Sequence, residues 1–369
     1  MDQILTHSLT AVRSVASIST DLVTGPWTLS DLKAGKIGAP KHGKTVFSCF
    51  HCGGGSTMGY KLAGFNVLGG VEIDPEMMAL YRENHKPRHS YLMGVQDFRK
   101  ILDKDLPPEL FNLDVLDGSP PCSSFSMSGS REDAWGKQKK FREGQTEQIL
   151  DDLFFDFIAI AKKLRPKMVV SENVKGMLAG AARGYVKMIF EQFEEAGYET
   201  QLFLCNASKM GVPQARERVF FVSRRKDLNL PKVVFQFDEK EIILRDAFSK
   251  IKHDHEHEKI TESSLAFYQK CTPGNSFSSV HAKGHRWNWS RESWNKPCRT
   301  MASTSASMIL HPAEPRPFCR DELCRIQSFP DDYNFMNQKP GYVCGMSVPP
   351  LMMQRVASSV YAQLLATQN

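Results

Sequence analysis

Cys122 lies in the stretch whose residue types are best suited to chemistry, 116–129 (LDGSPPCSSFSMSG). It follows a strand-like run and two prolines, Pro120 and Pro121, which cannot extend a sheet. We therefore expect its side chain at the end of a strand, where open α/β sheets bind their ligands. A thiol in that place can act as a nucleophile, whereas a lone cysteine in a loop can also be without a chemical role.

A glycine-rich loop, 52–59 (CGGGSTMG), separates a predicted strand from a predicted helix. Glycine lets backbone amides and a helix N-terminus come close to a ligand, although such a loop can also be a simple tight turn. Glu72 ends the next predicted strand, where a carboxylate can accept hydrogen bonds from ribose hydroxyls. Neither G-x-x-x-x-G-K-[ST] nor G-x-G-x-x-G is present, which argues against a P-loop and against a nicotinamide cofactor.

Two further motifs place charged side chains near strand ends. Glu172, in SENV (171–174), follows a buried run; partial desolvation there favours the protonated acid, although a glutamate could also simply cap the next turn. Arg216 and Arg218 alternate in QARER and share one face if the chain is extended. Their guanidinium groups suit phosphate, carboxylate or a base carbonyl oxygen, or the ion pairs of an edge strand.

A basic loop, 135–144 (WGKQKKFREG), follows the cysteine motif and contains Lys137, Lys139 and Lys140. It could follow a phosphate backbone, or it could be an ordinary solvated face. The net charge of +6 permits an anionic partner without requiring one.

Short apolar runs alternate with helix-length segments from Thr45 to Arg225, which predicts an α/β fold with a mostly parallel sheet covered by helices. Strands are predicted at 45–50, 65–73, 112–116, 167–172, 199–205 and 218–225. Helices are predicted at 75–84, 151–164, 185–197, 320–328 and 351–365, with Gly197 as a C-cap.

The composition is that of a globular protein, with 369 residues of which 41% are hydrophobic and 24% charged. No apolar run approaches the roughly 18 residues of a membrane helix, and we find no secretory signal. Nine cysteines, an odd number scattered over a long chain, suit a reducing compartment better than a disulfide framework.

Taken in order, these motifs resemble those of the DNA (cytosine-5)-methyltransferases. The resemblance runs from Thr45 to about Val360, interrupted by one variable segment. It is carried by SCFHCGGGSTMGYKLAGF, VEIDPEMM, PPCSSFSMSG, SENV, QARER, RTMAST, RDELCRIQSFPDDYNF and GMSVPP. The family implies a Rossmann-like methyltransferase fold, S-adenosylmethionine as the methyl donor, S-adenosylhomocysteine as the product, and no metal.

The resemblance also implies a domain organisation. Residues 44–225 are expected to form the catalytic, donor-binding domain, and 226–296 a small target recognition domain. Residues 297–369 carry the last motifs and a helix that returns to the catalytic domain. Residues 1–43 form an N-terminal extension of unknown role.

The family's chemistry assigns a role to each motif residue. Cys122 is expected to add to carbon 6 of cytosine, because carbon 5 is a poor nucleophile until the ring is activated. Glu172 would meet the charge at the N3 edge, and Arg218 would hold the carbonyl oxygen of the base. Arg216 would position the site and its backbone.

By the same resemblance the donor pocket includes Phe50, Gly53, Gly55, Glu72, Ile73, Asp97, Phe98, Pro121, Leu153, Ser347 and Val348. Three positions near that pocket depart from the family pattern. The family usually has Asp at Ser48, Gly at Cys52 and Asn at Met346, so the shape of the pocket is expected to differ in detail.

The partner implied is double-stranded DNA with the target base flipped out of the helix. Ser126, Ser128 and the loop through Phe141 resemble a lid that closes on the DNA, and the lysines of the basic loop would contact it. In the predicted recognition domain, Arg286 and Arg291, with Trp287 and Trp289, could read or wedge DNA. The two tryptophans could equally serve only to pack that domain.

Two alternatives remain open at this point: methylation of transfer RNA, and a catalytically impaired relative that still binds DNA. The DNA enzyme is favoured by PPCSSFS and by the separate recognition segment. We predict a monomer without membrane contact, acting in the cytoplasm (the bacterial nucleoid or a phage-infected cell), with a cognate restriction enzyme as a possible partner. His253, His255 and His257 alternate with acids, but their loop-like context does not predict a metal site.

Overall fold

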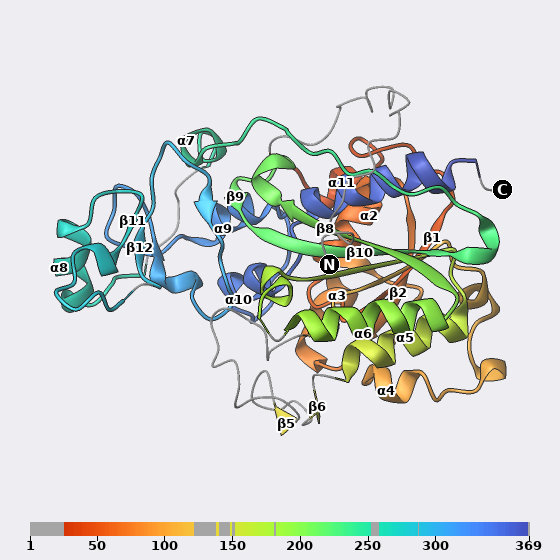
Figure 1. The fold of residues 1–369 in the computed structure, drawn as a ribbon. Coiled ribbons are helices and arrows are strands. Elements are labelled where there is room, and N and C mark those ends of the chain that lie inside the picture. The colour runs from red at the N-terminus through yellow and green to blue at the C-terminus, as the bar shows by residue number, and fades with distance from the viewer. Residues whose placement is uncertain are drawn as a thin grey trace.

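The computed structural model describes residues 26–121, 138–139, 148–149, 152–180, 182–251, 258–286 and 288–367. Its centre is a seven-stranded sheet in the order β3-β2-β1-β4-β7-β10-β8 (Figure 1). In that order the strands are His89–Leu92, Asn66–Glu72, Thr45–Cys49, Val115–Gly118, Met168–Val174, Glu217–Arg225 and Tyr198–Asn206.

The five strands from β3 to β7 pair in parallel, and β10 is antiparallel to both of its neighbours. The predicted mostly parallel sheet flanked by helices is therefore confirmed. Apolar periodicity carries no information on strand direction, so the reversal of β10 could not be predicted from its sequence. That reversal matters for the site, because it brings the first residues of β10 beside the last residues of β7.

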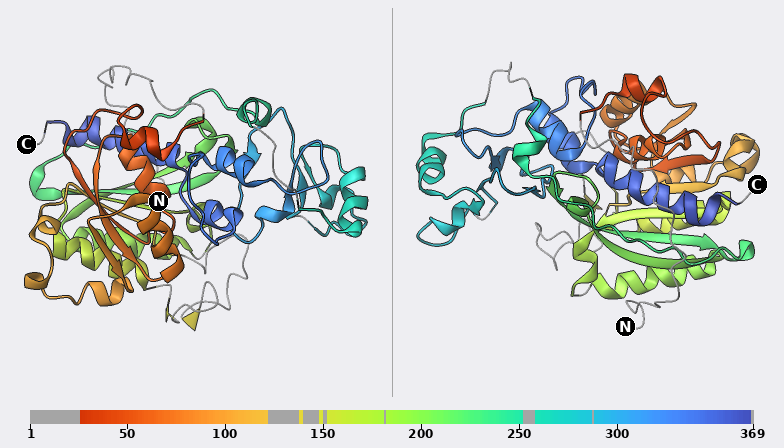
Figure 2. Two further views of the ribbon diagram at one scale, coloured as in Figure 1. Left: turned by 180° about the vertical axis from the view of Figure 1, so that it is seen from behind. Right: turned by 90° about the horizontal axis from the view of Figure 1, so that it is seen from above.

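Each face of the sheet carries its own hydrophobic core. One core joins the sheet to α2 (Gly55–Leu62), α3 (Pro75–His85) and α11 (Pro350–Val360). The other joins it to α4 (Val95–Phe98), α5 (Leu153–Leu164) and α6 (Ala182–Glu195), so that the molecule has three layers (Figure 2). The predicted helices at 75–84, 151–164, 185–197 and 351–365 thus correspond to α3, α5, α6 and the α11 region, and Gly197 has a positive φ just beyond α6.

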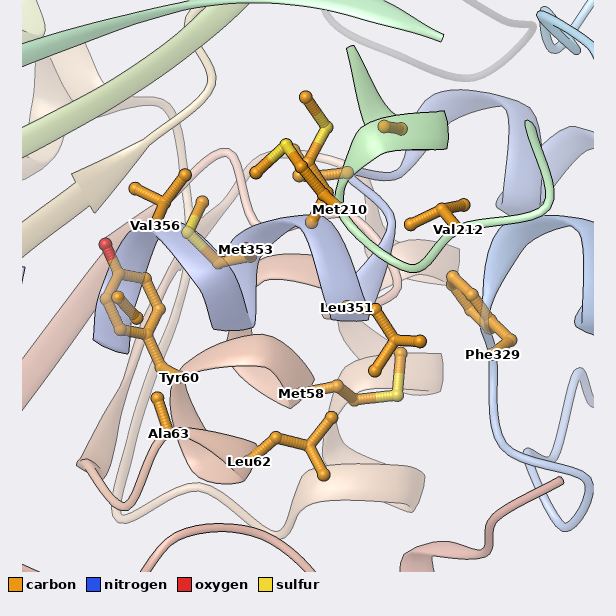
Figure 3. Packing of buried hydrophobic residues seen from close by; sticks show 14 of the residues in the cluster. Met58, Tyr60, Leu62, Ala63, Met210, Val212, Phe329, Leu351, Met353 and Val356 are labelled. Atoms are coloured by element: carbon orange, nitrogen blue, oxygen red, sulfur yellow. The ribbon is translucent and has the colours of Figure 1, made fainter. Parts of the chain in front are cut away.

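The C-terminal helix α11 packs directly on α2, the helix that follows the glycine-rich loop. Met58 and Tyr60 of α2 and Leu351, Met353 and Val356 of α11 fill the space between the two helices (Figure 3). This packing brings the last motifs of the chain beside the first, so that Ser347, Val348 and Pro350 lie against the glycine loop. The structure therefore joins sequence segments that are some three hundred residues apart.

A small lobe lies at one end of the molecule, beyond the carboxyl ends of the parallel strands (Figure 1). It contains α8 (Glu262–Lys270) and a sheet of β11 (Asn275–Ser276), β12 (Ser290–Arg291) and β14 (Ile309–Leu310). Its buried core consists of Tyr268, Cys271, Phe277 and Leu310. The predicted recognition segment 226–296 supplies most of this lobe, and β14 comes from the following segment.

Short elements connect these parts. They are α1 (Leu29–Lys33), β5 (Gln138–Lys139), β6 (Gln148–Ile149), β9 (Gln214–Ala215), α7 (Leu244–Ala247), β13 (Cys298–Arg299), α9 (Arg320–Gln327) and α10 (Pro340–Met346), and a π-helical turn at Tyr361–Leu365. Strand β13 pairs with β9, which fastens the C-terminal segment to the catalytic domain.

Candidate active site

On the face of the sheet that packs against α2, three neighbouring strands change from apolar to polar near their carboxyl ends. Val46 of β1, Val115 of β4 and Val170 of β7 are apolar on this face, and Val170 stands opposite Asp117 in the β4–β7 register. Two residues further along each strand, where side chains return to the same face, stand Ser48, Asp117 and Glu172, all buried. The core on this face therefore ends in a polar layer, which is the floor of the candidate site.

Glu172 and Arg218 form the central ion pair of this floor. Arg218 Nε lies 2.9 Å from Glu172 Oε1, and both side chains are largely buried. The antiparallel register places Phe220 opposite Glu172 and Arg218 opposite Val174, the last residue of the carboxylate's own strand. Burial lowers the pKa of the Arg218 guanidinium, and the neighbouring carboxylate opposes that shift. Two residues that the sequence predicted to act together thus meet in space.

Arg216 does not face the same opening. Its buried guanidinium donates from Nη1 to the Met301 carbonyl oxygen at 2.8 Å and from Nη2 to the Gly345 carbonyl oxygen at 3.0 Å. Burial is the main cause of its strongly lowered pKa. Arg216 therefore ties both C-terminal motif segments to the segment between β9 and β10, and the positioning role expected for it stays a prediction.

Asn173, which the sequence analysis did not single out, fixes the turn that leads to Cys122. Its Nδ2 donates to the Pro120 carbonyl oxygen at 2.9 Å, and its Oδ1 accepts from the Val174 amide at 2.8 Å. The asparagine follows Glu172 directly, so its position in SENV was the available signal. Cys122 itself lies outside the described residues, as do Ser126, Ser128, Lys137 and Lys140, and the side chain of Lys139.

The glycine loop is held by Glu72, whose carboxylate accepts three backbone amides. Oε2 accepts from Cys52 at 2.9 Å, and Oε1 accepts from Ile73 at 2.9 Å and Asp74 at 3.0 Å. Burial raises the pKa of this carboxyl. A carboxylate can accept about four hydrogen bonds, so Glu72 keeps capacity for a hydroxyl donor while it anchors the loop.

Close packing explains why the loop needs glycine. A side-chain Cβ on Gly55 would lie 2.2 Å from the Val348 carbonyl oxygen and 2.9 Å from Ser347 Cβ. Gly54 has φ +85 and faces His85, and no side chain caps the first turn of α2. The C-terminal segment therefore lies directly on the loop, and the N-terminal amides of α2 remain available to an acceptor.

The other predicted donor-pocket residues lie in varied surroundings. Phe50 is half-buried with φ 58, and Gly53 lies under the Tyr333 hydroxyl, which donates to its carbonyl oxygen at 2.6 Å. Phe98 and Leu153 are fully buried in the core on the α5 face. Asp97 is exposed and pairs with Lys100 at 3.1 Å, and Pro121 is half-buried at the last described position before the cysteine.

A buried amide network, also missed from the sequence, supports this side of the site. Gln214 Nε2 donates to Gln327 Oε1 at 2.7 Å, and Gln327 Nε2 donates to the Ser347 carbonyl oxygen at 2.7 Å. Gln214 Oε1 also accepts from the Met301 amide at 3.1 Å. The network and Arg216 together hold the two C-terminal segments at fixed positions. Isolated glutamines carry no sequence signal for such a role.

The three departures from the family pattern have different surroundings. Ser48 stands where the family usually has Asp, and its Oγ donates to Asp117 Oδ2 at 2.5 Å. The carboxylate in this place therefore belongs to the adjacent strand, β4. Burial raises the pKa of the Cys52 thiol to about 12, which keeps it protonated. The side chain of Met346 is 38% exposed at the end of α10. The eight cysteines of the described residues are all free thiols.

In the small lobe, the predicted DNA-binding arginines also make internal contacts. Arg291 donates from Nε to the Pro312 carbonyl oxygen at 2.9 Å, and its guanidinium lies 4.4 Å from the centre of the Tyr268 ring. Arg286 stacks on Phe267 at 4.8 Å and remains half-buried. Trp289 packs on Phe277 in the lobe core, which matches the packing alternative for this tryptophan, and Trp287 lies outside the described residues.

Among the residues that the structure describes, no group of three His, Cys, Asp or Glu side chains could hold a metal ion. His253, His255 and His257 lie outside those residues. Within the same part of the chain, no helix has the length and apolar character needed to cross a membrane.

Comparison with known proteins connects this site to a family. The family model described as C-5 cytosine-specific DNA methylase matches residues 45–362. Type II methyltransferase M.FnuDI of Fusobacterium nucleatum is 31% identical over 336 residues, covering 82% of this chain and 90% of that protein. Type II methyltransferase M.NgoPII of Neisseria gonorrhoeae is 29% identical over 354 residues, covering 85% and 94%.

Two solved structures share the fold at lower identity. A prophage-encoded Escherichia coli protein, described as a DNA modification methyltransferase, has a TM-score of 0.65 at 21% identity, covering 87% of this chain and 99% of its own. A mutant of Spodoptera frugiperda DNMT2 has a TM-score of 0.61 at 17% identity, covering 86% and 99%.

Proposed function

Because the chain belongs to the C-5 cytosine-specific DNA methylase family, we propose that it methylates cytosine in a short duplex DNA sequence with Cys122 as its nucleophile. The protein is a DNA (cytosine-5)-methyltransferase, and the Type II relatives do not favour the transfer RNA alternative. We further propose which residues carry out the reaction, which methyl donor the protein binds and which partners it has.

The observation that carries the proposed site is the meeting of three motifs at one point. The Glu172–Arg218 pair closes the floor at 2.9 Å, and the neighbouring Asn173 holds Pro120 at 2.9 Å, two residues before Cys122. An acid, a guanidinium and the stem of the cysteine turn therefore share one strand end. This supports a site in which a pyrimidine ring lies over the pair while the thiol reaches its edge.

In the proposed reaction, the Cys122 thiolate forms a bond to carbon 6, and the ring electrons move so that carbon 5 becomes nucleophilic. Glu172 supplies a proton or hydrogen bond at N3, and Arg218 donates to the carbonyl oxygen at carbon 2. After carbon 5 is methylated, its proton is released to water and the electron pair left behind re-forms the double bond between carbons 5 and 6. The sulfur–carbon bond breaks at the same time, its electron pair returns to sulfur as the thiolate, and the ring recovers its aromatic system.

The chain has groups that fit S-adenosylmethionine. The uncapped N-terminus of α2 suits the carboxylate of the donor, and the remaining lone pairs of Glu72 suit its ribose hydroxyls. When bound, the donor supplies an electrophilic methyl group on a sulfonium. Phe98 and Leu153 would support the pocket from the core beneath it, because their side chains are fully buried.

The proposed DNA contacts place the target base, flipped out of the duplex, between the sheet edge and the small lobe. The lobe would read the sequence, while Lys137, Lys139 and Lys140 would contact the backbone. By likeness to the Type II relatives, we expect a cognate restriction endonuclease in the same host. Action as a monomer, in the bacterial nucleoid or a phage-infected cell, stays a prediction.

A covalent trap tests the proposal. Duplex DNA containing 5-fluorocytosine should form a denaturation-resistant adduct with the protein in the presence of the donor, because fluorine cannot leave carbon 5 as a proton does. Cys122→Ser should abolish the adduct. Cys319→Ser is the matched control: this half-buried thiol is the N-cap of α9, a position that serine favours.

Parallel reactions with transfer RNA and unmodified DNA distinguish the substrates, and bisulfite sequencing of methylated DNA reads the sequence context. Adduct formation by the Cys122→Ser protein would contradict the proposed nucleophile. Methyl transfer to transfer RNA alone would contradict the proposed substrate.

A further inference from the structure

We propose that the N-terminal extension and the catalytic domain together form a second binding site, for a small organic polyphosphate, at the end of the sheet opposite the active site. The site is a cavity of about 480 Å³ that is lined by three lysines, Lys33, Lys41 and Lys61. None of these lysines has a role in the proposed methyl transfer. The inference therefore goes beyond the proposed function and does not depend on it.

The cavity lies at the amino ends of the parallel strands. Its walls include Gly43, two residues before β1, and Asn66 and Val67, the first residues of β2. Glu72 and the glycine loop, which belong to the candidate active site, stand at the carboxyl ends of the same strands. A strand rises roughly 3.3 Å per residue, so about 20 Å separates Asn66 from Glu72 along β2. A small ligand in the cavity therefore does not overlap the proposed donor pocket.

The extension is fixed to the catalytic domain by backbone contacts. The Leu29 amide donates to Asp332 Oδ1 at 2.6 Å, and the Ala39 amide donates to the Leu62 carbonyl oxygen at 2.7 Å. Lys33 lies between these two contacts along the chain. The structure therefore holds the backbone of the extension lysines in place beside α2.

The cavity carries positive charge that the protein does not neutralise. No acidic residue is among the described residues that line it, and none of its three lysines makes an ion pair within the same part of the chain. Neighbouring lysines outside the cavity do make such pairs: Lys36 lies 3.1 Å from Asp31, and Lys44 lies 3.9 Å from Asp114. The unpaired lysines are thus those that face the cavity.

Lys61 is the most buried of the three charges. Its side chain is half-buried, whereas Lys33 and Lys41 are exposed. Its Nζ donates to the His85 carbonyl oxygen at 3.3 Å, which uses one of its three donors. Burial, reinforced by the charges of Lys33 and Lys41, lowers the pKa of Lys61 to about 8. The folded protein therefore holds a partly desolvated cation among like charges, an arrangement that a bound anion relieves.

The lining residues indicate the chemistry of the ligand. Lysine binds phosphate as a point charge, whereas arginine has the planar fork that suits a carboxylate, and no arginine is among the described residues of the lining. Three positive charges suit a diphosphate or triphosphate. Leu29, Leu32 and Phe65 form an apolar wall, and the volume lies in the range of small-molecule sites. The phosphates would contact the lysines, and the organic part of the ligand would pack on this wall.

Isothermal titration calorimetry with ATP as the probe tests this assignment. The titration is done without DNA and with saturating S-adenosylhomocysteine, so that the adenosine group of ATP does not enter the proposed donor pocket. We expect ATP to bind at one site per chain and more tightly than inorganic tripolyphosphate, which has the charges but no group for the apolar wall. Absence of ATP binding, or equal affinities for the two probes, would contradict the assignment.

Charge-removing variants locate the site. Lys61→Gln keeps an amide that can donate to His85, and we expect it to lower the ATP affinity about tenfold. Lys33→Gln changes an exposed side chain and should lower the affinity about threefold. Lys36→Gln is the matched control: it removes the same charge from the same extension, but Lys36 pairs with Asp31 and does not line the cavity. Its affinity should equal that of wild type.

The comparison of the two exposed lysines decides the question even if Lys61→Gln lowers stability. Equal losses of ATP affinity in Lys33→Gln and Lys36→Gln would mean a general attraction to a basic surface, and the proposed site would be wrong.

The DNA backbone is the other source of phosphate. Fluorescence anisotropy with a labelled duplex compares Lys61→Gln with Lys36→Gln, and we expect the two variants to bind DNA alike, because the cavity lies at the far end of the strands. A loss of DNA affinity in Lys61→Gln alone would assign the lysines to the DNA backbone and overturn the proposal. If ATP binds as expected but wild type transfers no methyl group, the proposed function is wrong and this site stands.

Discussion

Two buried Glu–Arg pairs, one in the catalytic sheet and one at the root of the small lobe, are built differently. Glu292 is fully engaged: Oε1 accepts from Ser290 Oγ at 2.8 Å and Arg299 Nε at 2.7 Å, and Oε2 accepts from the Arg299 amide at 3.0 Å. Glu172 contacts only Arg218 within the described residues. The first pair has the contacts of a structural joint, whereas the second leaves an oxygen available to a substrate.

The same contrast extends to the surroundings of each pair. The catalytic pair stands on a seven-stranded sheet with a core on both faces, whereas the small lobe has four buried core residues and strands of two residues. Chemistry needs side chains held within a fraction of an ångström, which a large sheet provides. The role proposed for the small lobe, reading DNA, tolerates a smaller scaffold that adjusts on binding.

The largest effect that separates the two pairs should be on the rate of methyl transfer. Glu172→Gln removes the acid from the catalytic pair, and we expect the single-turnover rate at saturating DNA to fall about 10²–10⁴-fold. Glu292→Gln is the matched variant in the other pair, and it should lower stability while leaving that rate within about threefold of wild type. Equal losses of rate in the two variants would contradict the distinction between a working pair and a structural one.

The second comparison is between two arginines, one in each region, that donate hydrogen bonds to backbone carbonyl oxygens. Arg216→Ala removes two buried bonds to Met301 and Gly345 and leaves their carbonyl oxygens without a partner, so we expect about 3 kcal/mol of lost stability. Arg291→Ala in the small lobe removes a bond to the Pro312 carbonyl oxygen at 2.9 Å and two longer bonds, to Cys271 at 3.3 Å and Tyr268 at 3.5 Å. Because this side chain is only half-buried, we expect a smaller loss of about 1 kcal/mol.

Urea unfolding measures both values. If the free energy of unfolding falls equally in the two variants, the C-terminal segments do not depend on the hydrogen bonds of Arg216. Arg216→Ala should also slow methylation, because it removes the hydrogen bond that holds Gly345. Gly345 lies two residues before Ser347, and Ser347 Cβ lies close to the glycine loop.

The seven-stranded sheet could be predicted from the sequence more fully than the small lobe. Alternating apolar runs indicated every strand of the catalytic sheet except the short β3, because buried strands repeat apolar residues over several positions. SENV and QARER identified Glu172 and Arg218. Asn173 was missed because its role depends on a contact with the neighbouring segment at Pro120, and neither the direction of β10 nor the register of β4 is encoded in a local pattern.

The small lobe was harder to predict for a physical reason. Its strands have two residues each, too few to establish a period, and β14 joins it from a later segment. Aromatic and basic residues in 285–294 indicated DNA contact, yet Trp289 packs against the lobe core. A composition that suits nucleic acid also suits a small core, so composition alone could not separate the two roles.

The smallest expected effect tests which arginine of the lobe contacts DNA. Arg286 stacks on Phe267 and donates to Ser264 Oγ at 3.3 Å, a long bond that leaves most of its donors unused. If it contacts a phosphate, Arg286→Ala should weaken DNA binding less than about tenfold and reduce the slope of log affinity against log salt by about one. Arg291→Ala, whose guanidinium is engaged within the lobe, should weaken binding without changing that slope.

Fluorescence anisotropy at several salt concentrations measures both the affinity and the slope. An unchanged slope in Arg286→Ala, or a loss confined to one DNA sequence, would instead assign Arg286 to lobe packing or to a base edge.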